Sequence, residues 1–169
     1  MTHGPGAAAP ASSVEPSSVE PPTAAPLLAP PAGIVSHLMA RDAFSQWLGI
    51  TVLEADAGRS VLSMTVRENM LNGFGTLHGG VLFAFADSAF AFATNAGGWL
   101  SVAVDCSISY PAASRPGDVL RAVAVEQSRT NRLAFCEVTV SNQHDVAVGY
   151  FRGTVYRTTR PHVLGEHFG

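Results

Sequence analysis

The feature that most constrains the fold is a nearly continuous apolar segment over residues 81–93. We expect it to belong to one helix over 79–95, ended by Asn95 and the glycine pair that follows. Within 81–93 only Asp87 and Ser88 interrupt the apolar side chains, which otherwise point in every direction. A helix of this kind is buried on all sides. It is also too short to span a membrane, which needs about 20 apolar residues.

The segments around this helix alternate between apolar and polar residues, which predicts strands. We expect a short amphipathic helix over 34–48, with Leu38, Phe44, Trp47 and Leu48 on its apolar side. A hairpin of 50–55 and 60–66 precedes the central helix, and four strands follow it: 101–109, 118–127, 133–141 and 146–157. Because the connections are short, the strands pair as hairpins. The expected class is α+β, with an antiparallel sheet wrapped around the central helix.

Proline marks the boundary of the folded unit. Eight of the eleven prolines lie within residues 1–31, where alanine and serine fill most of the remaining positions. We expect residues 1–33 to form a disordered tail, because such a segment has little to bury. The domain then covers 34–160. Residues 161–169 are expected to form a flexible C-terminal tail in which His162 and His167 are solvated rather than metal ligands.

Composition excludes several classes of function. The ten Lys+Arg residues are all arginine, so a phosphate loop and lysine Schiff-base chemistry are ruled out. A net charge of −3 gives no basic face for nucleic acid or for a membrane surface. Charged residues make up only 14%, which suggests that part of the surface is buried in an oligomer. Cys106 and Cys136 are interpreted as inert buried thiols, and with no recognisable signal peptide we expect a cytoplasmic protein.

Asp87 is the candidate catalytic group, because a carboxylate two turns into an apolar helix cannot cap the helix and is costly to bury. The amides of Gly79 and Gly80, at the start of the same helix, could bind a developing oxyanion. Eight residues of helix place Gly79 and Asp87 roughly 12 Å apart. A single reacting carbonyl cannot reach both on one chain. If both act, the active site lies between two subunits.

Residues 72–90 closely resemble the signature of hotdog-fold acyl-CoA thioesterases, especially the PaaI branch of phenylacetic acid degradation. The resemblance rests on the opening Asn-Gly-x-Gly-x-x-His-Gly-Gly and on an Ala-Asp pair whose acid stands nine residues beyond the histidine. It covers roughly residues 38–158. Three positions depart from the usual pattern: Phe74, Phe85 and Ser88.

The resemblance implies a role for each matching residue. Asp87 would act as general base on water or as nucleophile, and Gly79 would donate its backbone N–H to the thioester carbonyl from across a dimer. His78 and Asn72 would help to position substrate and water, with the Ser88 hydroxyl beside the carboxylate. From the residues alone, His78 could instead cap its loop and Asn72 could be a turn residue. The family assembles as homotetramers, dimers of dimers, and uses neither a metal nor a cofactor.

The resemblance also implies an aryl-acyl-CoA substrate, of the phenylacetyl- or hydroxyphenylacetyl-CoA type, hydrolysed to free acid and CoA in phenylacetate catabolism. Arg115, Arg129 and Arg132 are candidates for the CoA phosphates, although each also fits an ordinary turn or hairpin. Phe83 is a candidate for the acyl pocket. Two alternatives remain open: a hotdog-fold hydratase or dehydratase of acyl-CoA or acyl carrier protein, and a non-catalytic acyl-CoA-binding protein.

Overall fold

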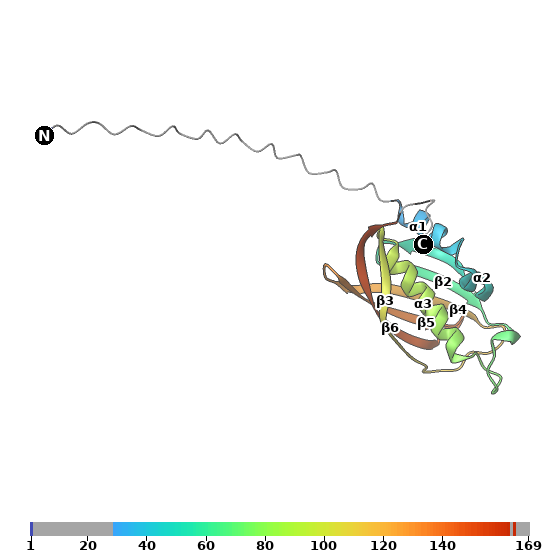
Figure 1. The fold of residues 1–169 in the computed structure, drawn as a ribbon. Coiled ribbons are helices and arrows are strands. Elements are labelled where there is room, and N and C mark those ends of the chain that lie inside the picture. The colour runs from blue at the N-terminus through green and yellow to red at the C-terminus, as the bar shows by residue number, and fades with distance from the viewer. Residues whose placement is uncertain (2–28, 163, 165–169) are drawn as a thin grey trace.

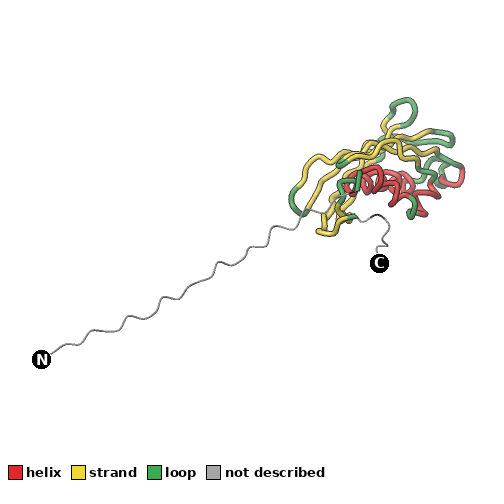
Figure 2. The backbone as a smooth tube through the Cα atoms, turned by 90° about the horizontal axis from the view of Figure 1, so that it is seen from above, coloured by secondary structure: helices red, strands yellow, loops and turns green. Residues whose placement is uncertain are grey.

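The central helix is present with the predicted bounds, as α3 (Gly79–Asn95). The computed structural model describes Met1, residues 29–162 and Leu164, and in it one curved sheet wraps around this helix (Figure 1). Viewed from above, the strands arch over one side of the helix (Figure 2). The expected α+β class, an antiparallel sheet around one long helix, is confirmed.

The sheet contains six strands in the order β1-β2-β4-β5-β6-β3, and every neighbouring pair is antiparallel. Their bounds are β1 (Thr51–Asp56), β2 (Arg59–Thr65), β3 (Trp99–Ser109), β4 (Val119–Arg129), β5 (Leu133–Ser141) and β6 (Ala147–Pro161). The predicted period of two is clearest in β5, where Ala134, Cys136, Val138 and Val140 are buried and the residues between them are exposed. Strand β3 forms one edge of the sheet and pairs with β6, so the predicted hairpin of 101–109 with 118–127 is wrong, and β4 pairs with β2 instead.

Helix α3 is held against the sheet by close packing and by buried polar contacts to β2 and β3. Phe85 and Phe90 are fully buried, and the Phe90 ring lies directly over Gly153 of β6. A Cβ at Gly153 would come within 2.7 Å of that ring, so this position accepts only glycine without a shift of its neighbours. The Ser60 hydroxyl of β2 donates to the Ala89 carbonyl oxygen at 2.7 Å.

The prediction that α3 is buried on all sides is wrong for one stripe of its surface. Phe83, Ala84, Asp87 and Ala91 are only half-buried. They recur every three or four residues and therefore lie on one helix face. The sheet touches this stripe only in part, through Phe151 of β6 at Phe83 and Cys106 of β3 at Asp87, so within the described part of this subunit the stripe is not fully covered. The catalytic candidate Asp87 lies in the middle of it.

The single helix predicted over 34–48 is two helices, α1 (Pro31–Met39) and α2 (Ala43–Leu48). The break occurs because Asp42 caps α2, accepting a hydrogen bond from the Ser45 backbone N–H at 2.9 Å. Helix α2 ends at Gly49, whose φ of 73° is left-handed. The predicted apolar side is also partly wrong, since Phe44 and Trp47 are exposed and stack on each other.

At the C-terminal end, the expectation that His162 is solvated is wrong. Only 5% of the residue is exposed, and its Nε2 lies 2.8 Å from the Asn95 side-chain oxygen at the end of α3. The predicted tails fall mostly outside the described residues, which lack 2–28, 163 and 165–169. No helix in the described part of the chain is long and apolar enough to cross a membrane.

Candidate active site

Asp87 is half-buried on α3, and its nearest polar neighbour comes from edge strand β3. The Cys106 Sγ donates to Asp87 Oδ1 at 3.8 Å. Burial raises the pKa of the Asp87 carboxyl above its usual range; the Cys106 hydrogen bond opposes this, and the negative charge of Asp42 adds to it. A carboxylate with a raised pKa on a half-exposed helix face can accept a proton from a reacting water.

Ser88, the next residue along α3, points away from solvent toward α2. Its hydroxyl lies 2.9 Å from the Ser45 hydroxyl and 3.0 Å from the Ala84 carbonyl oxygen, and it can donate its single proton to either. Ser45 in turn donates to the Asp42 carboxylate at 2.6 Å. A chain of hydrogen bonds therefore joins the cap of α2 to the residue beside the catalytic candidate.

The start of α3 exposes one backbone donor. His78 caps the helix by accepting the Gly80 N–H on Nδ1 at 2.9 Å, which leaves the proton of a neutral imidazole on Nε2. The Gly80 amide is thus occupied. The Gly79 N–H has no acceptor among the described residues, as expected for the first turn of a helix. Tyr110, just after β3, donates its hydroxyl to the Gly79 carbonyl oxygen at 3.1 Å.

Asn72 is used within its own loop in this subunit. Its side-chain oxygen accepts hydrogen bonds from the backbone N–H groups of Phe74 at 2.9 Å and Thr76 at 3.3 Å, and its amide donates to the Thr76 hydroxyl at 3.1 Å. These are the contacts of a turn residue, the alternative raised from the sequence. The same loop nevertheless lines a hollow of about 370 Å³ together with Gly79 and Tyr110.

A second hollow, of about 330 Å³, lies further along α3 beyond Asp87. It is mostly apolar and is lined by Ala91, Asn95, Leu38, Leu100 and Asp42, among others. Ala91 stands one turn after Asp87 on the same face, and Asp42 is close enough to act on the Asp87 carboxyl. The two hollows therefore lie at either end of the stripe that carries Asp87.

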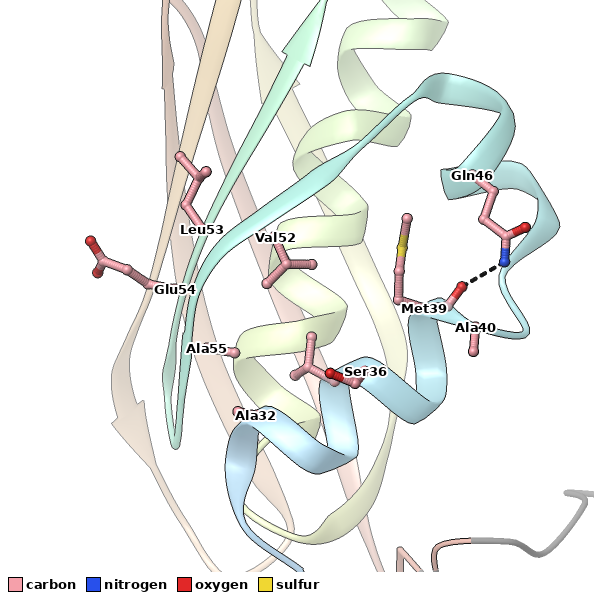
Figure 3. A pocket seen from close by; sticks show the side chains of 10 residues that line it. Ala32, Ser36, Met39, Ala40, Gln46, Val52, Leu53, Glu54 and Ala55 are labelled. Atoms are coloured by element: carbon pink, nitrogen blue, oxygen red, sulfur yellow. Dashed lines mark hydrogen bonds between the residues drawn. The ribbon is translucent and has the colours of Figure 1, made fainter.

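The largest hollow, about 560 Å³, is a different one, between α1, α2 and β1 (Figure 3). Its walls are mainly apolar, and the Gln46 amide bonds to the Met39 carbonyl oxygen across its rim. Its acid, Glu54, already pairs with Arg59. No residue of α3 lines it, so size alone does not identify the catalytic site.

Phe83 lies one turn before Asp87 on the half-buried stripe. Its ring packs edge-on against Phe151 of β6, with the ring centroids 5.4 Å apart. The residue thus lies between Gly79 and Asp87 along the helix. It lines neither of the two hollows on this face.

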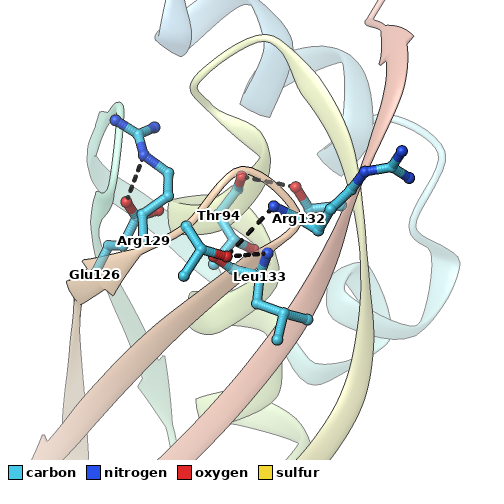
Figure 4. A network of polar contacts seen from close by, with 7 residues as sticks. Thr94, Glu126, Arg129, Arg132 and Leu133 are labelled. Carbon is cyan, nitrogen blue, oxygen red and sulfur yellow. Dashed lines mark hydrogen bonds and ion pairs between the residues drawn. The ribbon is translucent and has the colours of Figure 1, made fainter.

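The three candidate arginines do not lie together. Arg115 precedes β4, next to Ser114 of the Gly79 hollow. Arg129 and Arg132 flank the β4–β5 turn at the other end of β4, where Arg129 pairs with Glu126 at 3.3 Å (Figure 4). Arg132 donates to the Tyr156 hydroxyl. Since β4 is 11 residues long, roughly 33 Å separates the groups. One CoA molecule cannot use all three on a single subunit.

His78 and Asp87 do not meet within the subunit, since nine residues of helix separate them. The histidine–acid pair required by the hydratase alternative is therefore not formed in one chain. Among the described residues, no group of three or more His, Cys, Asp or Glu side chains is arranged to hold a metal ion.

Residues 74–148 match the family model described as the thioesterase superfamily. The acyl-coenzyme A thioesterase PaaI of Escherichia coli is 38% identical over 116 residues, 69% of this chain and 83% of that protein. Human acyl-coenzyme A thioesterase 13 is 34% identical over 105 residues, 59% of this chain and 74% of that protein. The solved structure of E. coli PaaI superposes with a TM-score of 0.74 at 36% identity, covering 78% of this chain and 96% of that chain.

The chain has a single helix wrapped by an antiparallel sheet, with one acid on the uncovered face of that helix. This fold and the relatives above define a hotdog-fold thioester hydrolase. The chain belongs to the thioesterase superfamily, and within it to the PaaI-type thioesterases.

Proposed function

We propose that this protein hydrolyses an aryl-acyl-CoA, of the phenylacetyl- or hydroxyphenylacetyl-CoA type, to the free acid and CoA. The observation that carries the proposal is the position of Asp87, the single acid on the half-buried stripe of α3. The E. coli relative is named an acyl-CoA thioesterase, and its solved structure is described as coming from the phenylacetic acid degradation operon. Both names support the substrate class.

In the proposed reaction, Asp87 removes a proton from a water molecule whose oxygen attacks the thioester carbonyl carbon. The carbonyl oxygen becomes an oxyanion held by the N–H of Gly79. When the C–S bond breaks, CoA leaves as a thiolate and takes up a proton. A direct attack by the Asp87 carboxylate is the other route, with an anhydride that water then opens. The proposed chemistry uses water and protein groups and requires no cofactor.

The distance between the two groups supports a shared site. Asp87 and Gly79 are about 12 Å apart along α3, so the Gly79 N–H would come from a second subunit. Edge strand β3 is the surface proposed for this contact. It exposes Val102 and Val104, which are 45% and 59% accessible, and an unpaired apolar edge strand favours pairing with another strand. We propose a homodimer formed this way, which would pair again into a tetramer.

The acyl group would occupy the apolar hollow beyond Asp87, lined by Ala91, Leu38 and Leu100. The thioester would then lie beside the carboxylate, and Phe83 would contact it from the preceding turn. Arg115 is the strongest phosphate candidate, because it is the arginine next to the hollow that contains Gly79. The cytoplasmic location also remains a proposal, supported by the free thiols of Cys106 and Cys136.

Purified protein should be mixed with a panel of aryl- and alkyl-CoA thioesters, with CoA release followed by a thiol reagent. We expect aryl-acyl thioesters to be cleaved fastest. Asp87→Asn should lower kcat by about 10²–10⁴-fold, the usual contribution of a general base. No CoA release from any thioester would refute the proposal, and binding without release would leave the non-catalytic alternative. Single-turnover hydrolysis in ¹⁸O-water tests the covalent route, because label found in Asp87 can arise only by that route.

A further inference from the structure

A β-bulge in β3 determines which side chain faces Asp87. Directly opposed residues of paired strands point to the same face of a sheet. Ala103 pairs with Val155 of β6 and Cys106 pairs with Gly153, while Val104 has no partner. Ala103 and Cys106 therefore point to the same face of the sheet although they are three residues apart, and Cys106 is the one that reaches Asp87 of α3.

Without the bulge, regular alternation would turn Asp105 toward α3 and Cys106 outward. Two carboxylates would then face each other on the apolar side of the sheet, and neither could remain ionised without a large cost. The extra residue replaces that acid with a thiol. Bulges commonly re-aim a side chain beside an active site in this way.

The Cys106 side chain can only act as a donor here. It is half-buried, and its Sγ lies 3.8 Å from Asp87 Oδ1. Burial and the nearby charges of Asp87 and Asp105 raise the pKa of the Cys106 thiol to about 11. The sulfur therefore keeps its proton at neutral pH. An ionised carboxylate has no proton to donate, so the S–H must point at Asp87.

We propose that Cys106 is a positioning residue for Asp87, whose thiol fixes one carboxylate oxygen and leaves the other to face substrate and water. This deepens the proposed function, because it gives the thiol a role through the proposed catalytic acid. The charged group facing Asp87 from another element is Asp42, at the cap of α2. The thiol favours the ionised carboxylate and Asp42 disfavours it, so they act in opposite directions.

The test compares wild type with Cys106→Ala and Cys106→Ser. Two quantities are measured: the acid limb of the kcat/KM–pH profile, and the titration of the Asp87 carboxyl by ¹³C NMR, assigned with Asp87→Asn. Loss of the thiol should move both to higher pH by roughly 0.5 unit, since S–H is a weak donor. Serine should restore them because its hydroxyl also donates. The kcat of Cys106→Ala should fall while KM is kept.

Cys136→Ala is the matched control, because this buried thiol on β5 donates to the Glu137 carbonyl oxygen, away from Asp87. It should move neither quantity. An Asp87 titration identical in wild type and Cys106→Ala would overturn the proposal. The NMR titration does not depend on turnover, so it decides the role of Cys106 even if no acyl-CoA is cleaved and the proposed function fails. Cys106→Val, which also lacks a donor and suits a strand, gives the same decision if the alanine variant folds poorly.

Discussion

Asp87 is held in surroundings that disfavour its ionised form. Burial raises the pKa of its carboxyl, and only a weak thiol donor opposes that effect. At neutral pH the ionised carboxylate is therefore less well solvated in the folded protein than in the unfolded chain. The ionised Asp87 carboxylate should therefore lower the free energy of unfolding, and its replacement by a neutral side chain should raise that free energy.

Asp87→Asn should raise the melting temperature at neutral pH while it lowers turnover. For an acid whose folded pKa lies above its unfolded value, the folded state binds more protons, so stability falls as pH rises between the two values. The gain should therefore vanish below the ordinary carboxyl pKa, where Asp87 is neutral in both states. Thermal melts at neutral and at acidic pH measure this. If Asp87→Asn raised the melting temperature equally at both pH values, the cause would be packing and not the charge of Asp87.

Asp42→Asn should move the acid limb of kcat/KM to lower pH. The Asp42 carboxylate raises the pKa of Asp87, so its removal lowers that pKa and keeps Asp87 ionised in more acidic solution. Asparagine is also a good helix cap, which preserves the start of α2. Asp105→Asn is the control, because Asp105 is exposed on the outward side of the bulge. If Asp42→Asn and Asp105→Asn shift the acid limb of kcat/KM equally, the cause is the change in the protein's net charge and not the position of Asp42.

At the scale of elements, the first turn of α3 allows its backbone donor to be removed selectively. Proline suits the first helical position and has no N–H. The preceding residue, His78, already has the extended conformation that proline requires, with φ −63° and ψ 131°. Gly79→Pro should therefore keep the helix and delete the proposed oxyanion donor.

We expect Gly79→Pro to lower kcat by about 10²–10³-fold, the usual cost of one oxyanion donor. Gly79→Ala adds a Cβ at the same place, 3.3 Å from the Tyr110 ring, but keeps the N–H. It should therefore retain most activity. Steady-state kinetics on the best substrate compares the two. Equal losses would mean that crowding against Tyr110, and not the missing donor, explains the effect.

The contact between α3 and β6 predicts that alanine substitution at two glycines of β6 changes the unfolding free energy by different amounts. Gly153→Ala would place a Cβ 2.7 Å from the buried Phe90 ring and should cost about 1–3 kcal/mol of unfolding free energy. A Cβ at Gly149 would meet Ile108 and Leu82 at an ordinary 3.5 Å, so Gly149→Ala should be near neutral. Urea unfolding measures both. A neutral Gly153→Ala would show that α3 can move away from the sheet.

The sequence predicted those elements whose signals are local. Helix α3 has its predicted bounds because the glycine pairs at its two ends and the apolar residues between them act within the segment itself. The single helix predicted over 34–48 overlooks one local signal, because Asp42 is a preferred N-cap residue and marks the start of a new helix. The burial of His162 leaves no such signal, because its partner, Asn95, is distant in sequence.

The surroundings of the candidate site depend on contacts between residues far apart in the sequence, which local sequence patterns do not predict. Residues 72–90 indicated Asp87 and Gly79, but Cys106 was interpreted as inert, since regular alternation of β3 gives no sign of the bulge that turns it inward. Tyr110 was missed for a similar reason, because its bond to Gly79 crosses 31 residues. The sequence also does not show which arginine lies near the candidate site, because that depends on the length of β4, which places Arg115 at one end and Arg129 and Arg132 at the other.

At the scale of the whole molecule, the proposed dimer would explain three observations together. Charged residues are scarce, at 14%. The Asp87 stripe of α3 is left half-covered, and edge strand β3 exposes Val102 and Val104. A dimer through this edge would cover apolar surface and bring the Gly79 of one subunit toward the Asp87 of the other.

This arrangement predicts that two inactive variants restore each other. In a mixed dimer of Asp87→Asn and Gly79→Pro subunits, one site receives both intact groups and the other receives neither. If the subunits exchange freely in an equal mixture, half of the dimers are mixed. About a quarter of wild-type activity should then return. The variants are unfolded and refolded together, and the comparison is the sum of the two refolded separately. Activity no higher than that sum would place Asp87 and its carbonyl donor within one subunit.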